Sequence, residues 1–425
     1  MPDRNEEKII SWAENHISRS LKKIKSLKEE RTNFVTLILE KVLNAFAEEK
    51  VGSHHFSSVS GYGHGDEGRG VIDRIYAKVL GADSAAVRMQ FVSGTHAISA
   101  ALFGILRPGD SLLSLTGRPY DTLEEVIGLN PSGIGSLIDF GIKYDEISLQ
   151  IEGKIDFKKL DKALVSPVKV VFIQRSCGYS SKSSLLIKEI QDICNFVHKK
   201  DPQIICFVDN CYGEFVEISE PCDVGADLVA GSLIKNLGGT ITPTGGYVAG
   251  RTDLVEKACA RLTAPGIGID SGTSFGLNRI ILQGLFLAPQ MTAEALIGAD
   301  LVACVFEDLG FDVNPSFGEK RGDIIQSVCF GNQLALQAVC RAFQSSSPVG
   351  SYLDPVPSIM PGYASDLIMA GGTFIDGSTS EFSADAPLRP PYNLYIQGGT
   401  HHAHQQIALR RALCQLVKED LLTIN

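Results

Sequence analysis

The spacing of apolar residues changes along the chain. Before position 50, Leu39, Val42 and Phe46 recur at helical intervals among Lys and Glu residues, which predicts one or two amphipathic helices. Between positions 51 and 70 the composition shifts to Gly, Ser and His, which is typical of a loop. We therefore expect residues 1–54 to form an N-terminal helical arm.

Beyond this loop, short β-branched runs alternate with helical segments. Strands are expected at residues 86–92, 111–115, 168–174, 203–209, 228–232 and 246–248, and helices at residues 95–106 and 184–199. Strands that alternate with helices form β-α-β units and a mostly parallel sheet whose two faces are buried. Residues 55–290 are therefore predicted to form one large α/β domain.

The last third of the chain has a different pattern. A long helix is expected over residues 276–307, followed by a strand at 324–330 and a helix at 333–343. A Pro- and Gly-rich stretch then occupies residues 347–391. This mixture predicts a smaller α+β domain over residues 291–425.

The composition narrows the class of protein. The chain has 425 residues, of which 44% are hydrophobic and 21% are charged, as in ordinary globular proteins of two or three domains. Its formal net charge of −10 argues against nucleic acids and anionic membranes as partners, since both require a basic surface. The ten cysteines form no C-x-x-C pair, and no secretory signal or membrane-spanning run is expected. A reducing cytoplasm is therefore the predicted compartment.

A G-x-G-x-x-G pattern at residues 63–68 looks like a dinucleotide-binding fingerprint. Its context differs, because residues 57–60 make a poor parallel strand and the carboxylates of Asp66 and Glu67 would face a pyrophosphate. We do not expect NAD to bind there.

Candidate ligand-binding residues follow the predicted strands, at the sheet edge where open α/β sheets bind ligands. The run Ser93-Gly94-Thr95-His96 leads from a strand into a helix. A helix N-terminus favours an anion such as phosphate, although Ser and Thr are also ordinary N-cap residues. Tyr120 follows the next strand and is placed to stack on a flat ring, although a core tyrosine is the commoner case.

Two charged residues complete this set. Asp209 ends an apolar strand, where its carboxylate either pairs with a protonated heterocyclic nitrogen or caps a helix. Lys235 follows the next strand beside Gly238 and Gly239, a setting in which desolvation would make its amine nucleophilic enough for a Schiff base. A phosphate cradle, an aromatic ring, a carboxylate and a lysine in combination predict pyridoxal 5′-phosphate as the cofactor.

The chain resembles the fold-type-I pyridoxal-phosphate enzymes, and among them the methionine γ-lyase-like proteins known as aluminium resistance proteins. The resemblance covers nearly the whole chain and implies the aspartate aminotransferase-like fold, with a mostly parallel central sheet. The segments that carry it are residues 61–69, 93–97, 174–176, 178–179, 209–215 and 231–236.

The resemblance implies a role for each candidate residue. Lys235 would hold the cofactor as a Schiff base and move the substrate α-proton, and Asp209 would pair with the pyridine nitrogen. Tyr120 would stack on the ring and donate a proton to a leaving thiol. Ile234 stands where better-known relatives have a hydroxyl residue, so one phosphate contact is missing. The residues implied to hold or line the phosphate are Ser93, Gly94, Thr95, His96 and Ser232.

Further implied contacts concern the substrate and a second subunit. Arg389, in a Pro-rich segment, would hold the substrate carboxylate through its bidentate guanidinium, unless it is a surface arginine. Arg175 is a second candidate for the substrate, and either it or Tyr179 would contact the phenolate oxygen of the cofactor. Tyr62 and Arg69 would reach the phosphate of a neighbouring subunit, which makes a homodimer the smallest catalytic unit and allows a tetramer.

We therefore expect a carbon–sulfur lyase that cleaves a sulfur amino acid by β- or γ-elimination. The fold does not fix the reaction, so an aminotransferase, another pyridoxal-phosphate enzyme acting on amino acids, and a non-catalytic binding protein stay open. No metal site is expected, because His401, His402 and His404 lack a ligand spacing such as H-E-x-x-H. The sequence does not identify which amino acid is the substrate.

Overall fold

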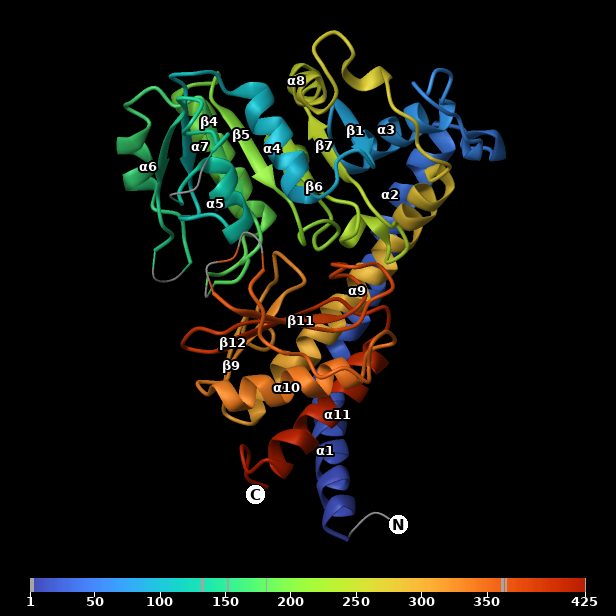
Figure 1. The fold of residues 1–425 in the computed structure, drawn as a ribbon, viewed down its shortest axis with the longest axis vertical. Coiled ribbons are helices and arrows are strands. Elements are labelled where there is room, and N and C mark those ends of the chain that lie inside the picture. The colour runs from blue at the N-terminus through green and yellow to red at the C-terminus, as the bar shows by residue number, and fades with distance from the viewer. Residues whose placement is uncertain are drawn as a thin grey trace. The chain divides into compact units, whose positions relative to one another are not determined.

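Two sheets organise the chain, one in each of two compact units (Figure 1). One unit comprises Leu37–Pro289, and the other comprises Met1–Thr36 together with Gln290–Asn425. The computed structural model describes residues 4–130, 134–150, 153–180, 182–360, 363 and 365–424.

The larger unit holds a seven-stranded sheet in the order β1-β7-β6-β5-β4-β2-β3. The neighbours from β6 to β3 are parallel, whereas β7 is antiparallel to both β6 and β1. The expected mostly parallel α/β sheet is confirmed. The strands are β1 (Ser84–Arg88), β2 (Ser111–Ser114), β3 (Lys143–Glu146), β4 (Val170–Gln174), β5 (Ile205–Asp209), β6 (Leu228–Ser232) and β7 (Gly246–Gly250).

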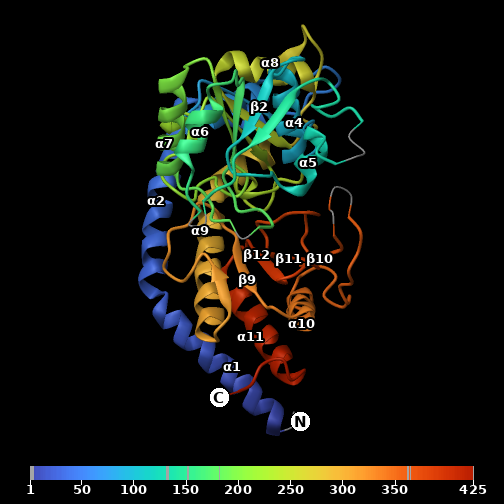
Figure 2. The same ribbon diagram turned by 90° about the vertical axis from the view of Figure 1, so that its left-hand side faces the viewer.

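Helices cover both faces of this sheet (Figures 1 and 2). Successive strand residues point to opposite faces, so Phe207 joins the core formed with α4 (Gly94–Ile105) and α8 (Thr252–Leu262), whereas Cys206 faces His198 of α7 (Ile187–Lys200). The other elements of the unit are α3 (Glu67–Leu80), α5 (Asp121–Ile127), α6 (Phe157–Ala163) and the short turns η1 (Ser53–Phe56), η2 (Pro221–Val224), η3 (Asn236–Gly238) and η4 (Gly268–Asp270).

The apolar pattern locates the central strands better than the edge strand. All five residues of β4, β5 and β6 are buried, as expected for parallel strands covered on both faces. The pattern does not predict β3, because its residues Lys143, Asp145 and Glu146 are charged and exposed. An edge strand needs no apolar run when it pairs on one side only, here with β2.

The smaller unit is built on a five-stranded antiparallel sheet in the order β10-β11-β12-β9-β8. The strands β10 and β11 lie inside the Pro- and Gly-rich stretch that the pattern leaves without regular structure. The elements are β8 (Asp312–Asn314), β9 (Gln326–Cys329), β10 (Leu367–Ala370), β11 (Ser383–Pro387), β12 (Asn393–Gln397), α10 (Gln333–Ser345) and α11 (His402–Lys418).

The helices expected in the N-terminal arm, residues 1–54, are α1 (Arg4–Lys23) and α2 (Lys25–Glu48), and both have buried apolar residues. Ala13 and Ile17 of α1 are buried in the same core as Leu409 and Leu413 of α11. The helix α2 continues from this unit into the larger one. Burial of their apolar faces therefore makes both helices part of the compact units.

The helix α9 (Asn278–Asp308) confirms the long helix expected over residues 276–307, and it runs through both units. Among the described residues it is the one helix long and apolar enough to cross a membrane, although no such run was expected. However, 67% of its apolar window is buried inside the protein. Leu301 and Val305 belong to the core of the smaller unit, so the apolar character of α9 is explained by packing.

Candidate active site

Three of the predicted segments meet at one edge of the larger sheet. The strands β5 and β6 are parallel neighbours, so both end at this edge. Asp209 is the last residue of β5, Ser232 is the last residue of β6, and Lys235 follows it closely. The helix α4 begins beside them, because a Cβ placed on Gly94 would lie 3.2 Å from Cβ of Ser232.

The start of α4 has the donors that a phosphate group requires. A Cβ on Gly94 would lie 3.1 Å from Sγ of Cys211, so glycine permits the close approach. Ser93 is the N-cap, and its Oγ accepts a hydrogen bond from the His96 amide at 3.1 Å. The first amides of a helix have no intrahelical acceptor and lie at the positive end of its dipole. Together with the hydroxyl of Ser232, this donor set fits a phosphate.

His96 shapes the turn that precedes α4. Its Nδ1 accepts a hydrogen bond from the Val92 amide at 3.2 Å, and its ring packs edge-on against Phe91. Burial lowers the pKa of His96, which favours the neutral imidazole. His96 therefore supports the turn that leads into α4, and its expected place beside a phosphate stays a prediction.

Tyr120 lies next to the same helix. Its hydroxyl is 2.7 Å from Oγ1 of Thr95, which is also 3.1 Å from Oγ1 of Thr122. The amide of Tyr120 donates to Oε1 of Gln174, the last residue of β4, at 2.9 Å. Burial raises the pKa of Tyr120, and the negative charge of Asp209 raises it further, so the phenol stays protonated. Tyr120 is thus placed as a neutral proton donor.

Asp209 is a carboxylate with little access to water. Its side chain is 2% exposed, and Oδ1 accepts a hydrogen bond from the Cys211 amide at 3.1 Å. Burial raises the pKa of Asp209, although the positive charge of Lys235 opposes this. A buried carboxylate is stabilised by a cationic partner, and a protonated ring nitrogen would supply one. The residues present therefore fit pyridoxal phosphate at its nitrogen as well as at its phosphate.

Lys235 combines burial with several acidic neighbours. Burial lowers the pKa of its amine, but Cys211, Tyr212, Asp209 and Tyr120 oppose this effect and together raise the pKa above its ordinary value. This balance favours the ammonium form, which must lose a proton before the amine can act as a nucleophile. The Schiff-base role of Lys235 stays a prediction.

Tyr212, a residue without an expected role, contacts Lys235. Nζ of Lys235 lies 3.7 Å from the centroid of the Tyr212 ring. Tyr212 has a φ of 70°, a left-handed conformation that is uncommon for an aromatic residue. Asn236 stabilises this turn, because its Nδ2 donates to the carbonyl oxygens of Tyr212 at 3.1 Å and Glu214 at 2.9 Å. No spacing in the sequence marks Tyr212, so only the structure identifies it.

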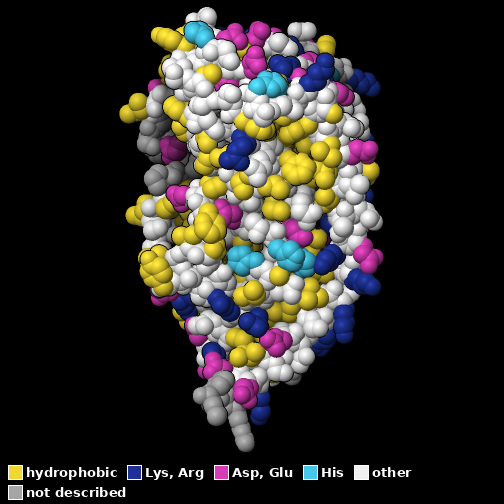
Figure 3. Space-filling model, turned by 90° about the vertical axis from the view of Figure 1, so that its right-hand side faces the viewer, with side chains coloured by type: hydrophobic (Ala, Val, Ile, Leu, Met, Phe, Trp, Pro, Cys, Tyr) yellow, Lys and Arg dark blue, Asp and Glu magenta, His cyan; other side chains and the backbone are white. Residues whose placement is uncertain are grey.

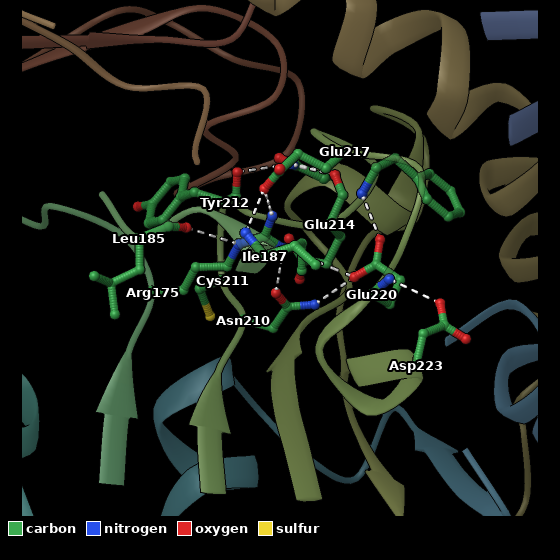
Figure 4. A network of polar contacts seen from close by, with 12 residues as sticks. Arg175, Leu185, Ile187, Asn210, Cys211, Tyr212, Glu214, Glu217, Glu220 and Asp223 are labelled. Atoms are coloured by element: carbon green, nitrogen blue, oxygen red, sulfur yellow. Dashed lines mark hydrogen bonds and ion pairs between the residues drawn. The ribbon is translucent and has the colours of Figure 1, made fainter. Parts of the chain in front are cut away.

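Arg175 does not have the surroundings of a substrate ligand (Figure 4). Its side chain is fully buried, and its guanidinium donates to Oδ1 of Asn210 at 2.9 Å and to Oε2 of Glu217 at 3.1 Å. Its Nε also donates to the Leu185 carbonyl at 3.4 Å. The suggestion that Arg175 binds substrate or cofactor is corrected accordingly. Sequence reasoning placed it at a strand end but could not tell which way the side chain turns.

The Arg175 network supports the loop that follows Asp209 (Figure 4). Nδ2 of Asn210 donates to Oε2 of Glu220 at 2.9 Å, and Oε1 of Glu220 accepts from the Phe215 amide at 2.9 Å. The Arg175 amide also donates to the Asp209 carbonyl at 3.1 Å. These contacts fix both ends of the loop that carries Tyr212.

Glu214 is a second buried acid that the sequence analysis did not single out. Its Oε1 accepts a hydrogen bond from the Tyr247 hydroxyl at 2.7 Å, and its side chain has no exposed surface. Burial raises the pKa of Glu214 to about 8. At neutral pH the carboxyl is therefore mostly protonated, which removes the cost of a buried charge.

Tyr62 lies in the loop before α3 and Arg69 in the first turn of α3, and both are hydrogen-bonded to residues 270–272 of the same chain. Arg69 donates to the carbonyl oxygens of Gly272 at 2.5 Å and Asp270 at 2.8 Å. The carbonyl of Tyr62 accepts from the Gly272 amide at 2.9 Å, while the Tyr62 side chain is 71% exposed. Their expected role toward a neighbouring subunit remains a prediction.

The G-x-G-x-x-G loop serves as the start of a helix. Asp66 is the N-cap of α3, and its carboxylate accepts hydrogen bonds from the Arg69 amide, the Ser274 hydroxyl and Nδ2 of Asn278. The negative charge thus occupies the helix N-terminus, where a dinucleotide fingerprint would place the pyrophosphate.

The roles expected for Tyr179 at the cofactor and for Arg389 at the substrate stay predictions. Tyr179 follows Gly178, where a Cβ would lie 3.0 Å from Nε2 of Gln174 and 3.7 Å from Cβ of Tyr120. Tyr179 is thus adjacent in sequence to a residue of this site. Arg389 has an exposed side chain and lies in the smaller unit, between β11 and β12.

The three C-terminal histidines have partners within the smaller unit. Nδ1 of His401 accepts from the Ala403 amide at 3.0 Å, which caps α11, and Nε2 of His404 is 2.8 Å from the Ser346 carbonyl. Nδ1 of His402 is 2.8 Å from Oε2 of Glu294, and its Nε2 is 2.8 Å from Nζ of Lys28. These contacts join α11 to its neighbours.

Comparisons with known proteins show the family to which the chain belongs. A model of the methionine gamma-lyase family matches residues 8–417. The chain is 48% identical to the uncharacterized protein YnbB of Bacillus subtilis, over 90% of this chain and 91% of that protein. The crystal structure of a carbon-sulfur lyase involved in aluminum resistance from Clostridium novyi has a TM-score of 0.92 and 44% identity, and the match covers 98% of this chain and 100% of that chain.

A more distant structure shares the fold alone. The pyridoxal-5′-phosphate-dependent protein YhfS of Escherichia coli has a TM-score of 0.59 at 17% identity, with 89% of this chain and 95% of that chain covered. The matched family model extends over nearly all of the described residues, in both units. The chain therefore belongs to the methionine gamma-lyase family and has the architecture of the fold-type-I pyridoxal-phosphate enzymes.

Proposed function

We propose that this protein is a pyridoxal-phosphate-dependent carbon–sulfur lyase that cleaves a sulfur amino acid by β- or γ-elimination. The observation that carries the proposal is the meeting of the α4 N-terminus, Asp209 and Lys235 at one sheet edge. Each group matches one part of the cofactor: the phosphate, the ring nitrogen and the carbonyl carbon. The name of the Clostridium novyi relative supports a carbon–sulfur bond as the one that is cleaved.

Lys235 and Asp209 have different proposed roles at the cofactor site. When bound, pyridoxal phosphate supplies an electron sink for the carbanion formed at the substrate α-carbon. Lys235 holds the cofactor covalently and, once its amine is free, accepts the α-proton at Nζ. Asp209 keeps a negative charge at the ring nitrogen, and its burial makes that interaction stronger than it would be in water.

Tyr120 is proposed to protonate the leaving sulfur. A thiolate leaves more readily when a positioned acid gives it a proton. The phenol of Tyr120 stays protonated because burial raises its pKa, and Thr95 fixes the position of its oxygen. This arrangement suits elimination, in which the carbon–sulfur bond breaks and the departing sulfur takes up a proton.

The remaining candidates concern the substrate and a second subunit. Arg389 is proposed to bind the substrate carboxylate, and Tyr62 and Arg69 to complete the phosphate site of a neighbouring subunit in a homodimer or tetramer. Tyr62 and Phe275 are 71% and 69% exposed, and hydrophobic side chains gather on one face of the molecule (Figure 3). Exposed apolar surface of this kind supports association of copies.

Transamination on the same cofactor is the second candidate, because Lys235 and Asp209 would serve it equally well. A substrate screen separates the two. The protein is loaded with pyridoxal phosphate and incubated with methionine, cystathionine and cysteine, without a 2-oxo-acid acceptor, and thiol, ammonia and 2-oxo acid are measured. Elimination releases all three, with repeated turnover. Amino-group transfer without thiol release would favour the aminotransferase, and no product from any substrate would leave the lyase proposal without support.

A further inference from the structure

We propose that the larger unit contains a zinc-binding site formed by Cys194, His198, Cys206 and Asp227. Ligand atoms of His198, Cys206 and Asp227 all lie within 4.8 Å of one another. Thiolate, imidazole and carboxylate are the ligand types that bind Zn²⁺ in proteins. The proposal is independent of the lyase function, because none of these residues belongs to the candidate active site.

The cluster lies at the sheet edge opposite the candidate active site. Cys206 is near the start of β5, whereas Asp209 ends the same strand at the carboxyl edge. Asp227 directly precedes β6, and its amide donates to the Cys206 carbonyl at 2.9 Å. Because β5 and β6 are parallel, the two sites occupy opposite ends of the same strands. A metal ion at the cluster therefore does not compete with the proposed cofactor.

The helix α7 supplies the other two side chains. Cys194 and His198 are four residues apart on this helix and so share one face. Nε2 of His198 is 2.9 Å from Oδ2 of Asp227, and the thiols of Cys194 and Cys206 are hydrogen-bonded to each other. Two sulfur atoms, a nitrogen and a carboxylate therefore converge, which is the number of ligands in a closed tetrahedral zinc site.

The distances suit a tetrahedral ion after small movements. Zinc ligands lie about 2.0–2.3 Å from the metal, which places neighbouring ligand atoms about 3.3–3.8 Å apart. The longest separation among the His198, Cys206 and Asp227 ligand atoms is within 4.8 Å, so shifts of about 1 Å suffice. The side chain of His198 is 28% exposed, which gives an ion a path from solvent.

Arg251 balances the charge of the proposed site. Zn²⁺ bound by two thiolates, one carboxylate and a neutral imidazole carries a single net negative charge. The Arg251 guanidinium donates to Oδ1 of Asp227 at 3.4 Å, whereas His198 contacts Oδ2. A cation bonded to a ligating carboxylate neutralises that charge and orients the ligand.

Metal binding would exchange protons for zinc at the two thiols. Burial and the neighbouring Cys194 thiol raise the pKa of Cys206, so its thiol is protonated without a metal. Coordination forms two Zn–S bonds and breaks two S–H bonds, and both protons pass to water. Proton release is therefore a signature that an ion bound only by histidine and carboxylate would not give.

The test uses the full-length chain without an affinity tag. Co²⁺ serves as a spectroscopic probe, because its d–d bands are strong in a tetrahedral site and a sulfur ligand adds a thiolate-to-metal band. Zn²⁺ is then titrated against a chromophoric chelator, and proton release is measured in weakly buffered solution. The variants are Cys206→Ala and His198→Gln. The control is Cys340→Ala, which removes a buried thiol of the smaller unit.

We expect one Co²⁺ per chain with both kinds of band in the wild type and in Cys340→Ala, displaced by Zn²⁺ with release of about two protons. Cys206→Ala should lose the thiolate band, and its affinity for Zn²⁺ should fall at least about 100-fold. If Cys206→Ala does not fold, His198→Gln, at a partly exposed position, should show the same loss of affinity.

Three results would overturn the proposed zinc site. The first is an octahedral Co²⁺ spectrum without a thiolate band in the wild type, which would place the ion at histidines and carboxylates elsewhere. The second is a thiolate band that persists in Cys206→Ala. The third is wild-type affinity for Zn²⁺ in His198→Gln.

Discussion

The hydroxyl of Tyr120 lies 2.7 Å from Oγ1 of Thr95, which ties the proposed acid to the first turn of α4, the helix at the proposed phosphate site. At its other end, the Tyr120 amide donates to Gln174 of the neighbouring strand. The proposed proton donor and the proposed phosphate site are therefore parts of one hydrogen-bonded unit. Movement of α4 would displace the phenol as well.

Replacing Tyr120 with Phe should remove the proton donor and leave the ring. We expect kcat for thiol release to fall at least about 100-fold, the usual contribution of a general acid, with the absorption of the bound cofactor preserved. The control is Tyr144→Phe, whose hydroxyl donates to Glu146 on the edge strand. Wild-type kcat in Tyr120→Phe would exclude this residue as the acid.

Replacing Arg175 with Met should destabilise the protein because it leaves Glu220 without its buried cation. Loss of one partner of a buried ion pair costs about 3–5 kcal/mol in the free energy of unfolding, which urea denaturation measures. The matched control is Arg118→Met, since Arg118 pairs with Glu124 but is 51% exposed, and the loss there should be at most about 1 kcal/mol. If Arg175 bound substrate instead, KM would rise while the free energy of unfolding stayed close to that of the wild type.

Glu214 should make the protein less stable in alkaline solution. Its pKa is raised to about 8 in the folded protein, against 4.5 when it is exposed, so the folded state binds the extra proton between these values. Stability from this group is complete below about pH 4.5 and is lost as the pH rises through 8.

The comparison that tests this is Glu214→Gln, which keeps a neutral side chain of similar shape. The free energy of unfolding of the variant should decline less than that of the wild type between pH 6 and 9. Glu48→Gln, at a position that is 62% exposed, should leave the wild-type slope unchanged. Parallel pH profiles for wild type and Glu214→Gln would show that the carboxyl ionises normally.

Replacing Arg389 with Leu should weaken substrate binding without affecting the cofactor. Loss of a bidentate contact to a carboxylate should raise KM on the order of 100-fold, and the cofactor absorption should be retained. The control is Arg107→Leu, an arginine of the larger unit that bonds to nearby backbone carbonyls. A normal KM in Arg389→Leu would assign the substrate carboxylate to another residue.

The central strands were predictable because burial on both faces leaves a direct mark on the sequence. Val170–Gln174 and Ile205–Asp209 are buried throughout, and each carries an unbroken apolar run before its polar last residue. The strand β3 has no such run, because it lies at the sheet edge. The strand β11 was not predicted for another reason. Ser383–Pro387 is buried, but its residues are small or polar and do not form the apolar β-branched run that predicts a strand.

The grouping of candidate residues was predictable where it depends on position along a strand. Asp209 and Ser232 end β5 and β6, Lys235 follows β6, and parallel strands bring their carboxyl ends to one edge. The direction in which a side chain points could not be predicted from the same pattern. Arg175 also follows a strand end but turns into the interior, and Tyr212 reaches Lys235 through a left-handed turn that no periodicity marks.

The most direct test of the central claim is the absorption spectrum of the protein loaded with pyridoxal phosphate, compared with that of Lys235→Ala. The control is Lys182→Ala, a lysine of the same unit whose Nζ donates to the Arg118 carbonyl. We predict that the wild type and Lys182→Ala show the band of a cofactor joined to a lysine, and that Lys235→Ala lacks it. The same band in Lys235→Ala would contradict the assignment of Lys235 and, with it, the proposed active site.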